Sequence, residues 1–105
     1  MSAATLTAEV AREYLRDVEP MWRAFWFHMH LTAKNLEEFA AGLPKIDDAT
    51  YNYHVIGQKN DLARWIREVI GDSVLARHLS EAKSKEEAAI MVATRVRELK
   101  HLTRA

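Results

Sequence analysis

Cysteine is absent from this chain of 105 residues. Its absence excludes disulfides, thiolate metal sites, iron–sulfur clusters and cysteine nucleophiles, and it is compatible with a reducing compartment. Glycine and proline are scarce, with 3 and 2 residues, which disfavours a loop-rich or all-β design. Hydrophobic residues make up 49% and charged residues 29%, a balance typical of folded domains rather than disordered chains.

Long apolar runs are also missing. No run approaches the roughly 20 residues that a membrane-spanning helix needs. The first ten residues lack the basic cluster followed by an apolar stretch that marks a signal peptide. We therefore expect a cytoplasmic protein without a membrane segment, and the initial methionine leads us to expect a complete small protein.

The chain has no excess of either charge, with 15 Lys and Arg against 15 Asp and Glu. This balance disfavours generic nucleic-acid binding, which usually requires a basic excess. The one local exception is a basic C-terminal tail that offers a candidate contact with phosphates: Arg95, Arg97, Lys100, His101 and Arg104. We favour the simpler interpretation that these cations offset the dipole of a C-terminal helix.

Capping residues followed by apolar side chains at helical spacing predict a mainly α fold of five or six short helices in one domain over residues 1–105. Asn35 with Glu38 and Ser84 with Glu87 form capping boxes. The other predicted caps are Thr7, Asp47, Asn60 and Asp72. The predicted ends are Pro20, Gly42 with Pro44, Gly57, Gly71 and about Leu102. Phe39, Leu43, Trp65 and Ile66 are the predicted centre of the core.

Residues 21–31 admit two interpretations. On a helix, Trp22, Phe25, Trp26 and Met29 share a face. On a strand, Phe25, Phe27, Met29 and Leu31 point one way, and Trp26, His28 and His30 point the other. The density of aromatic residues slightly favours one short extended segment near residues 24–31.

The block from Lys59 to Asp72, followed by Leu75-Ala76, resembles the core of a small prokaryotic domain family of unknown function. Members of that family carry an aromatic–His segment, similar to Tyr51–Val55 here. An Asn-Asp-Phe-Ala-x-Trp-Ile block and a Gly-Asp turn follow, and Leu62 stands where members usually have Phe. The resemblance covers roughly residues 25–102 and leaves an N-terminal amphipathic helix, residues 1–20, outside it. It implies an accessory module and transfers no activity.

The motif formed by His54, Asn60, Asp61 and Trp65 is the first candidate site. Its functional interpretation is a polar pocket beside an exposed indole, suited to a peptide or small ligand. The structural interpretation is a helix cap at Asn60, a hydrogen bond between His54 and the Asn60-Asp61 turn, and a Trp65 that belongs to the core. We favour the structural interpretation.

Histidines supply the second candidate site. His28 and His30 share a face if their segment is a strand, so both imidazoles reach one metal ion, with His54 as a third ligand. Zinc, nickel or copper suits such ligands. On a helix the two rings point about 200° apart and the site fails. Two solvent-facing or interfacial histidines are the simpler interpretation.

No catalytic signature is present, and we expect no enzymatic activity. The adjacent carboxylates at 37–38, 47–48 and 86–87 each lie in the first turn of a predicted helix, where they offset its dipole. Aromatic and methionine side chains instead crowd the stretch near residue 25, and the interface candidates are Trp22, Phe25, Trp26 and Met29. The sequence therefore predicts a non-enzymatic interaction module that binds a protein partner or self-associates, with no cofactor. The alternative is a His-based metal-binding or sensing domain.

Overall fold

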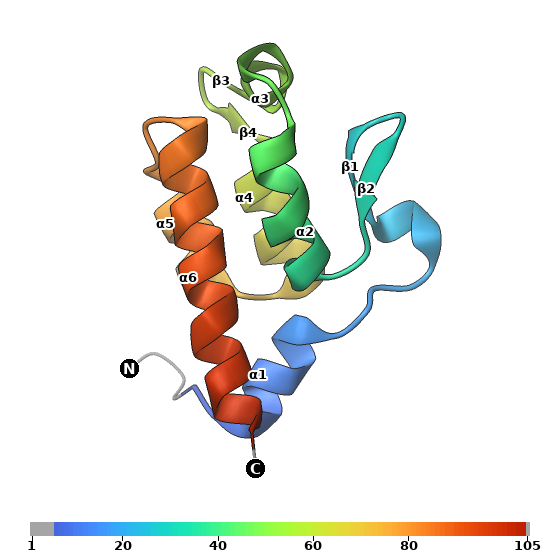
Figure 1. The fold of residues 1–105 in the computed structure, drawn as a ribbon, viewed down its shortest axis with the longest axis vertical. Coiled ribbons are helices and arrows are strands. Elements are labelled where there is room, and N and C mark those ends of the chain that lie inside the picture. Colours follow the sequence, from blue (N-terminus) through green and yellow to red (C-terminus); the bar gives the residue numbers. More distant parts are fainter. Residues whose placement is uncertain (1–5, 105) are drawn as a thin grey trace.

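Six α-helices build most of the structure, a computed structural model that describes residues 6–104 (Figure 1). They are α1 (Ala8–Leu15), α2 (Leu36–Gly42), α3 (Asp48–His54), α4 (Asp61–Trp65), α5 (Ser73–Ser80) and α6 (Lys85–Thr103). Three short helical turns accompany them: η1 (Met21–Arg23), η2 (Leu43–Lys45) and the π-helical η3 (Ile66–Ile70), which continues α4. The predicted mainly α fold is confirmed.

Two short antiparallel strand pairs interrupt the helices. β1 (Phe25–His28) pairs with β2 (Leu31–Ala33), and β3 (Val55–Ile56) pairs with β4 (Lys59–Asn60). The β1–β2 hairpin stands beside α2, and β3, β4 and α3 lie together at one end of the molecule (Figure 1). The long helix α6 packs against α2, α5 and, toward its C-terminal end, α1 (Figure 1).

Polar side chains cap all six α-helices, as the sequence pattern predicts. Each cap accepts a hydrogen bond from the backbone N–H three residues further along, which satisfies a donor that the first turn leaves free. The six caps are Thr7, Asn35, Asp47, Asn60, Asp72 and Ser84. In the two predicted capping boxes the return bond lies one residue further back: Glu38 and Glu87 accept from the N–H groups of Lys34 and Lys83, the residues before the caps, and not from the caps themselves.

The core lies where α2, α4 and the β1–β2 hairpin meet. Phe39 is fully buried and stacks on Trp65, with ring centroids 5.3 Å apart and an angle of 14° between the rings. The Phe25 ring meets Phe39 edge-on at 5.2 Å. Leu43 and Ile66 are also fully buried, so the predicted centre of the core is confirmed. Ala11 of α1 belongs to the same core; residues 1–5 of the predicted N-terminal helix lie outside the described residues.

Two predicted helix ends are wrong. α1 ends at Leu15 and not before Pro20, because the backbone of Arg16 is extended, with ψ of 158°. The Arg16 guanidinium donates to the carbonyls of Val69 and Ile70 at the end of η3. α3 ends at His54 and does not continue to Gly57. Residues 55–60 form the β3–β4 hairpin, and Gly57, with φ of 59°, lies in its turn.

α2 ends at Gly42, as predicted, and this glycine has a second role in packing. Its φ of −79° is ordinary for a helix, so no left-handed cap is formed. A Cβ at this position would lie 2.8 Å from Cε2 of Phe27, whose ring is buried against Phe25 and Phe39. The glycine is therefore needed for the close approach of β1 to α2.

Gly42→Ala is expected to lower the free energy of unfolding by about 1–3 kcal/mol, because the added methyl group displaces the buried Phe27 ring. Helix propensity alone would give the opposite sign, a gain of about 1 kcal/mol. Urea denaturation measures the difference. The control is Ala41→Gly at the exposed neighbouring position, where only helix propensity acts and the glycine variant is expected to be the less stable protein. A Gly42→Ala variant as stable as the parent would contradict the packing argument.

Candidate functional site

Four large apolar side chains from residues 21–29 form what we call the Trp–Met surface: Met21, Trp22, Trp26 and Met29. Trp22 is 79% exposed, Met29 77% and Trp26 52%. They come from η1, from β1 and from the turn that follows β1. Three of the four predicted interface residues are therefore accessible to a partner.

Phe25, the fourth predicted interface residue, is buried, and this prediction is wrong. Only 6% of its surface is exposed. The reason is the alternation of β1, which turns Phe25 and Phe27 into the core and Trp26 and His28 to the outside. The favoured extended segment is confirmed at residues 25–28. The predicted alternation fails at Met29, because the strand pairing shifts between Trp26 and His28 and Met29 lies in the exposed turn.

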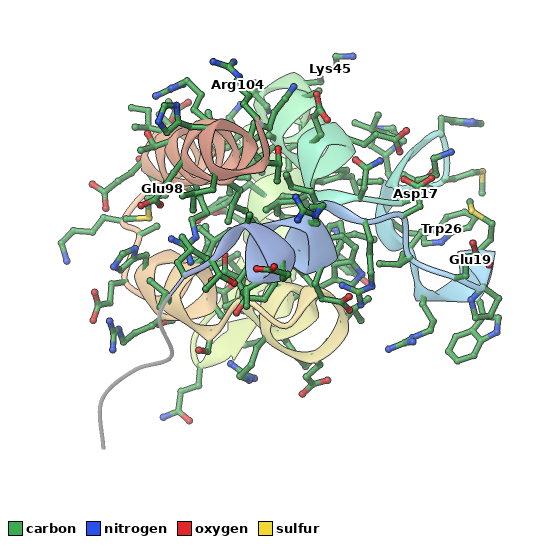
Figure 2. The ribbon with its side chains drawn as sticks, turned by 90° about the horizontal axis from the view of Figure 1, so that it is seen from below. Asp17, Glu19, Trp26, Lys45, Glu98 and Arg104 are labelled. Carbon is green, nitrogen blue, oxygen red and sulfur yellow. The ribbon has the colours of Figure 1, made fainter. Side chains whose placement is uncertain are left out.

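Charges of both signs lie near the Trp–Met surface. Figure 2 shows Trp26 on the side of the molecule that carries Asp17 and Glu19, away from Glu98 on α6. Asp17 is held in place there by Asn35, whose Nδ2 donates to it at 2.8 Å, and by Lys34 at 3.8 Å. The surface is therefore apolar at its centre and mixed in charge around it, as protein interfaces commonly are.

A shallow pocket of about 290 Å³ lies between β1 and the α4–η3 segment, next to this surface. Trp26, Arg64 and Glu68 stand at its exposed positions. Its buried lining includes Phe25, His54 and Trp65. Because Trp26 belongs to both, the pocket extends the Trp–Met surface.

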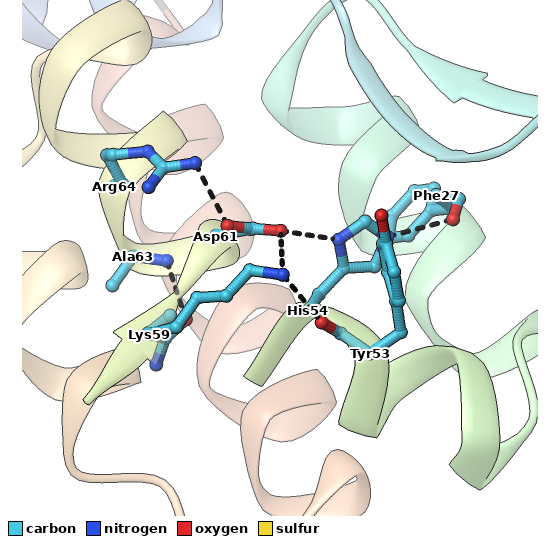
Figure 3. A network of polar contacts seen from close by, with 8 residues as sticks. Phe27, Tyr53, His54, Lys59, Asp61, Ala63 and Arg64 are labelled. Atoms are coloured by element: carbon cyan, nitrogen blue, oxygen red, sulfur yellow. Dashed lines mark hydrogen bonds and ion pairs between the residues drawn. The ribbon is translucent and has the colours of Figure 1, made fainter. Parts of the chain in front are cut away.

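A polar network joins the pocket lining to the hairpin (Figure 3). His54, at the end of α3, is 6% exposed. Its Nδ1 lies 2.9 Å from Oδ2 of Asp61, and its Nε2 lies 2.8 Å from the carbonyl oxygen of Phe27. The predicted bond between His54 and the Asn60-Asp61 turn is thus present. The network links α3, α4 and β1 at one point.

Asp61 has three basic neighbours. Besides His54, Lys59 Nζ lies 3.6 Å from Oδ2, and Arg64 donates to Oδ1 at 2.9 Å (Figure 3). Burial alone would raise the pKa of Asp61, but the hydrogen bond from His54 and the charges of Lys59 and Arg64 outweigh it and hold the pKa below its ordinary value. The carboxylate is therefore ionised at neutral pH and acts as a counter-ion.

Asn60 and Trp65 have the structural contacts that the sequence favours. Asn60 caps α4, and its side-chain amide also donates to the carbonyl of Leu79 at 3.2 Å. Trp65 is buried, and its Nε1 donates to the carbonyl of Arg23 at 2.7 Å. The indole is therefore not an exposed ligand platform. It ties the end of η1 to α4.

The three histidines of the candidate metal site are not brought together as ligands. His28 and His30 are neighbours, with ring centroids 6.4 Å apart, but Nδ1 of His28 accepts the backbone N–H of His30. Both ring nitrogens of His54 are already bonded, to Asp61 and Phe27. Within residues 6–104, no group of three or more His, Cys, Asp or Glu side chains is arranged to hold a metal ion.

The basic tail is largely engaged within the protein. Arg95 binds Asp72 and Glu98, and Lys100 binds Glu37 of α2 at 2.8 Å. Arg97 donates to Thr94 at 3.3 Å. Two of the predicted phosphate contacts are therefore already neutralised by carboxylates.

The ion pair between Asp72 and Arg95 was not predicted from the sequence, where the two residues are a helix cap and part of a basic tail. Asp72 is fully buried, and its carboxylate accepts hydrogen bonds from Nε of Arg95 at 2.7 Å and from Nη2 at 2.9 Å. Burial would lower the pKa of Arg95, but the bonds to Asp72 and Glu98 raise it above its ordinary value. The two residues are 23 positions apart, so no local spacing in the sequence indicates that they pair.

Comparisons of the chain with protein-family models, with curated proteins and with solved structures found no match. No helix among residues 6–104 has the length and hydropathy to cross a bilayer.

Proposed function

We propose that this protein is a non-enzymatic interaction module that self-associates through the Trp–Met surface. The observation that carries the proposal is the exposure of two tryptophans and two methionines in residues 21–29 beside an otherwise closed core. Each of these side chains gains from removal from water at about 25 cal/mol per Å² of apolar surface. Tryptophan and methionine are also enriched at protein interfaces.

A second copy of this chain is the partner that the charges favour. The formal net charge is zero, so two copies approach without a net repulsion. Acidic and basic side chains both lie near the surface, as Asp17, Glu19 and Arg64 illustrate. A strongly basic or acidic partner would require an excess of one sign, which the sequence does not have.

An interaction role also accounts for the lack of reactive groups in the adjoining pocket. His54, Asp61 and Trp65 have partners inside the fold. In the part of the chain that the structure describes, no buried side-chain nitrogen or oxygen is left without a hydrogen bond. What these groups do is hold β1 in place, and β1 presents Trp26.

Trp22→Ser and Trp26→Ser are expected to weaken self-association by tenfold or more each, because each removes a large apolar side chain from the contact. Sedimentation velocity over a concentration series gives the dissociation constant for each variant. The matched control is Ile90→Ser on α6, an apolar side chain that is 67% exposed outside the Trp–Met surface. Circular dichroism checks that the variants remain folded.

Three outcomes of this experiment can be told apart. Loss of association in the two tryptophan variants, with the Ile90 variant unchanged, supports the proposal. A parent protein that stays monomeric at every concentration overturns self-association, and association that only Ile90→Ser weakens moves the contact to α6.

A further inference from the structure

The two hydrogen-bond partners of His54 determine which protonation state of the ring satisfies both bonds. Its two ring nitrogens each face an oxygen at hydrogen-bond distance, the carboxylate of Asp61 at 2.9 Å and the carbonyl of Phe27 at 2.8 Å (Figure 3). A carbonyl oxygen has no proton to give. Asp61 is ionised, since its neighbours keep its pKa low. Both partners are therefore acceptors, and both nitrogens must donate.

Only the imidazolium can do this. A neutral imidazole carries one N–H, so its other nitrogen would turn a lone pair toward an oxygen less than 3 Å away. Because the ring is buried, water cannot take over the lost bond without a rearrangement. The geometry is thus complete in one protonation state and incomplete in the other.

We propose that His54 is a proton-dependent latch, which fastens the β1–β2 hairpin to α3 and α4 as the imidazolium and releases β1 on losing a proton. The latch goes beyond the proposed function and holds whether or not the chain self-associates. Release of β1 also moves part of the Trp–Met surface. Trp26 directly precedes the bonded residue Phe27, and Met29 lies two residues after it.

The bond that is lost on deprotonation is the one to β1. A neutral His54 keeps its single proton on Nδ1, because the bond to the charged Asp61 is stronger than the bond to a carbonyl. The Nε2 lone pair then faces the Phe27 oxygen. Asp61 itself stays paired with Lys59 and Arg64, so the α4 side of the network survives.

The charged and titratable groups around His54 come from each neighbouring element. α4 supplies Asp61 and Arg64, β4 supplies Lys59, α3 supplies Tyr53 with its ring centroid 5.2 Å away, and η3 supplies Glu68 in the same pocket. β1 supplies the uncharged Phe25 ring at 5.1 Å. Among the groups named here, the imidazole is the one whose charge ordinarily changes between pH 5 and 8.

The release is local. Trp65 still donates to the carbonyl of Arg23, and Phe25 still packs on Phe39. These contacts hold the start of β1, so the segment from Phe27 through the turn to β2 opens while the rest of the domain stays folded.

The sign of the pH dependence follows for both members of the pair. The bond from Nε2 of His54 to the Phe27 carbonyl is present while the ring carries a proton on both nitrogens, and it is lost when the Nε2 proton leaves. The stabilisation from Asp61 is present above the pKa of its unfolded state and is lost as the pH falls through the lowered pKa of the folded state. The hairpin is therefore held most firmly in mildly acidic solution.

Two measurements on the dilute full chain test the latch. Nitrogen-15 shifts of the His54 ring are expected to show two N–H groups at about pH 6 and one, on Nδ1, at about pH 8.5. Hydrogen exchange, corrected for the intrinsic effect of pH, is expected to show protection of amides 27–33 falling about tenfold over the same range. Amides of α6 serve as the internal reference.

His54→Gln removes the titration and is expected to abolish the pH dependence of protection in residues 27–33. The matched control is His78→Gln, at an exposed histidine of α5, which should leave that dependence intact. A single N–H on His54 at about pH 6, or protection that does not change with pH in the parent protein, overturns the latch. These two readings come from the parent chain and stay decisive if His54→Gln does not fold.

Discussion

Phe39→Ala is expected to lower the free energy of unfolding by about 3–5 kcal/mol. The side chain is fully buried, and its ring contacts the rings of Phe25, Phe27 and Trp65 at centroid distances of 5.2, 5.2 and 5.3 Å. Truncation removes the buried apolar surface and leaves a cavity that these rigid rings cannot fill. A domain of this size has a total stability of about 5–15 kcal/mol, so the loss is a large part of it.

Urea denaturation followed by circular dichroism measures the change, and Trp22→Ala is the matched control. That residue is also a large aromatic, but it is 79% exposed, so the expected change is within about 0.5 kcal/mol for the monomer. If Phe39→Ala leaves no folded baseline, Phe39→Leu gives a smaller and measurable loss at the same site. Equal effects at positions 39 and 22 would contradict the assignment of core and surface.

Local rules explain what the sequence predicts correctly. A cap needs only a polar side chain three residues before the N–H that it accepts, and all six predicted caps are present. Phe39, Leu43 and Ile66 are predicted as core from helical spacing, and they are fully buried. Both features depend on neighbours within a few residues along the chain.

Contacts between distant segments explain what it predicts wrongly or leaves out. α2 ends at Gly42 as predicted, but the need for glycine at this position comes from the ring of Phe27, 15 residues earlier. Just past the end of α1, Arg16 donates to the carbonyls of Val69 and Ile70, which lie far along the chain. Phe25 matches an interface residue by composition, yet the strand pairing of β1 turns it inward. None of these partners is visible in local spacing.

The candidate site divides in the same way. The sequence predicts a hydrogen bond between His54 and the Asn60-Asp61 turn, and the structure shows that Asp61 is the partner. The second bond of His54, to Phe27, crosses 27 residues and turns an ordinary corner into an attachment for β1. That attachment gives the histidine a role that neither its cap-like position nor the metal hypothesis predicts.

Asp72→Ala is expected to cost about 3–5 kcal/mol, because it leaves the charge of Arg95 in a buried position without its counter-ion. The Arg95 side chain is only 12% exposed, and Asp72 is fully buried. The substitution also removes the cap of α5, since Oδ1 of Asp72 accepts the N–H of Leu75 at 3.1 Å. Glu98→Gln is the control, because Glu98 is 54% exposed and its pairing with Arg95 contributes at most about 1 kcal/mol.

A double variant distinguishes an unpaired charge from a lost cap. Asp72→Ala combined with Arg95→Met removes both charges, and a buried ion pair replaced by apolar groups is often close to neutral in stability. We therefore expect the double variant to be more stable than Asp72→Ala alone by about 1–3 kcal/mol. The stability that it still lacks relative to the parent protein is the contribution of the α5 cap. A double variant that is less stable than Asp72→Ala would mean that the Arg95 stem, and not its charge, holds α5 to α6.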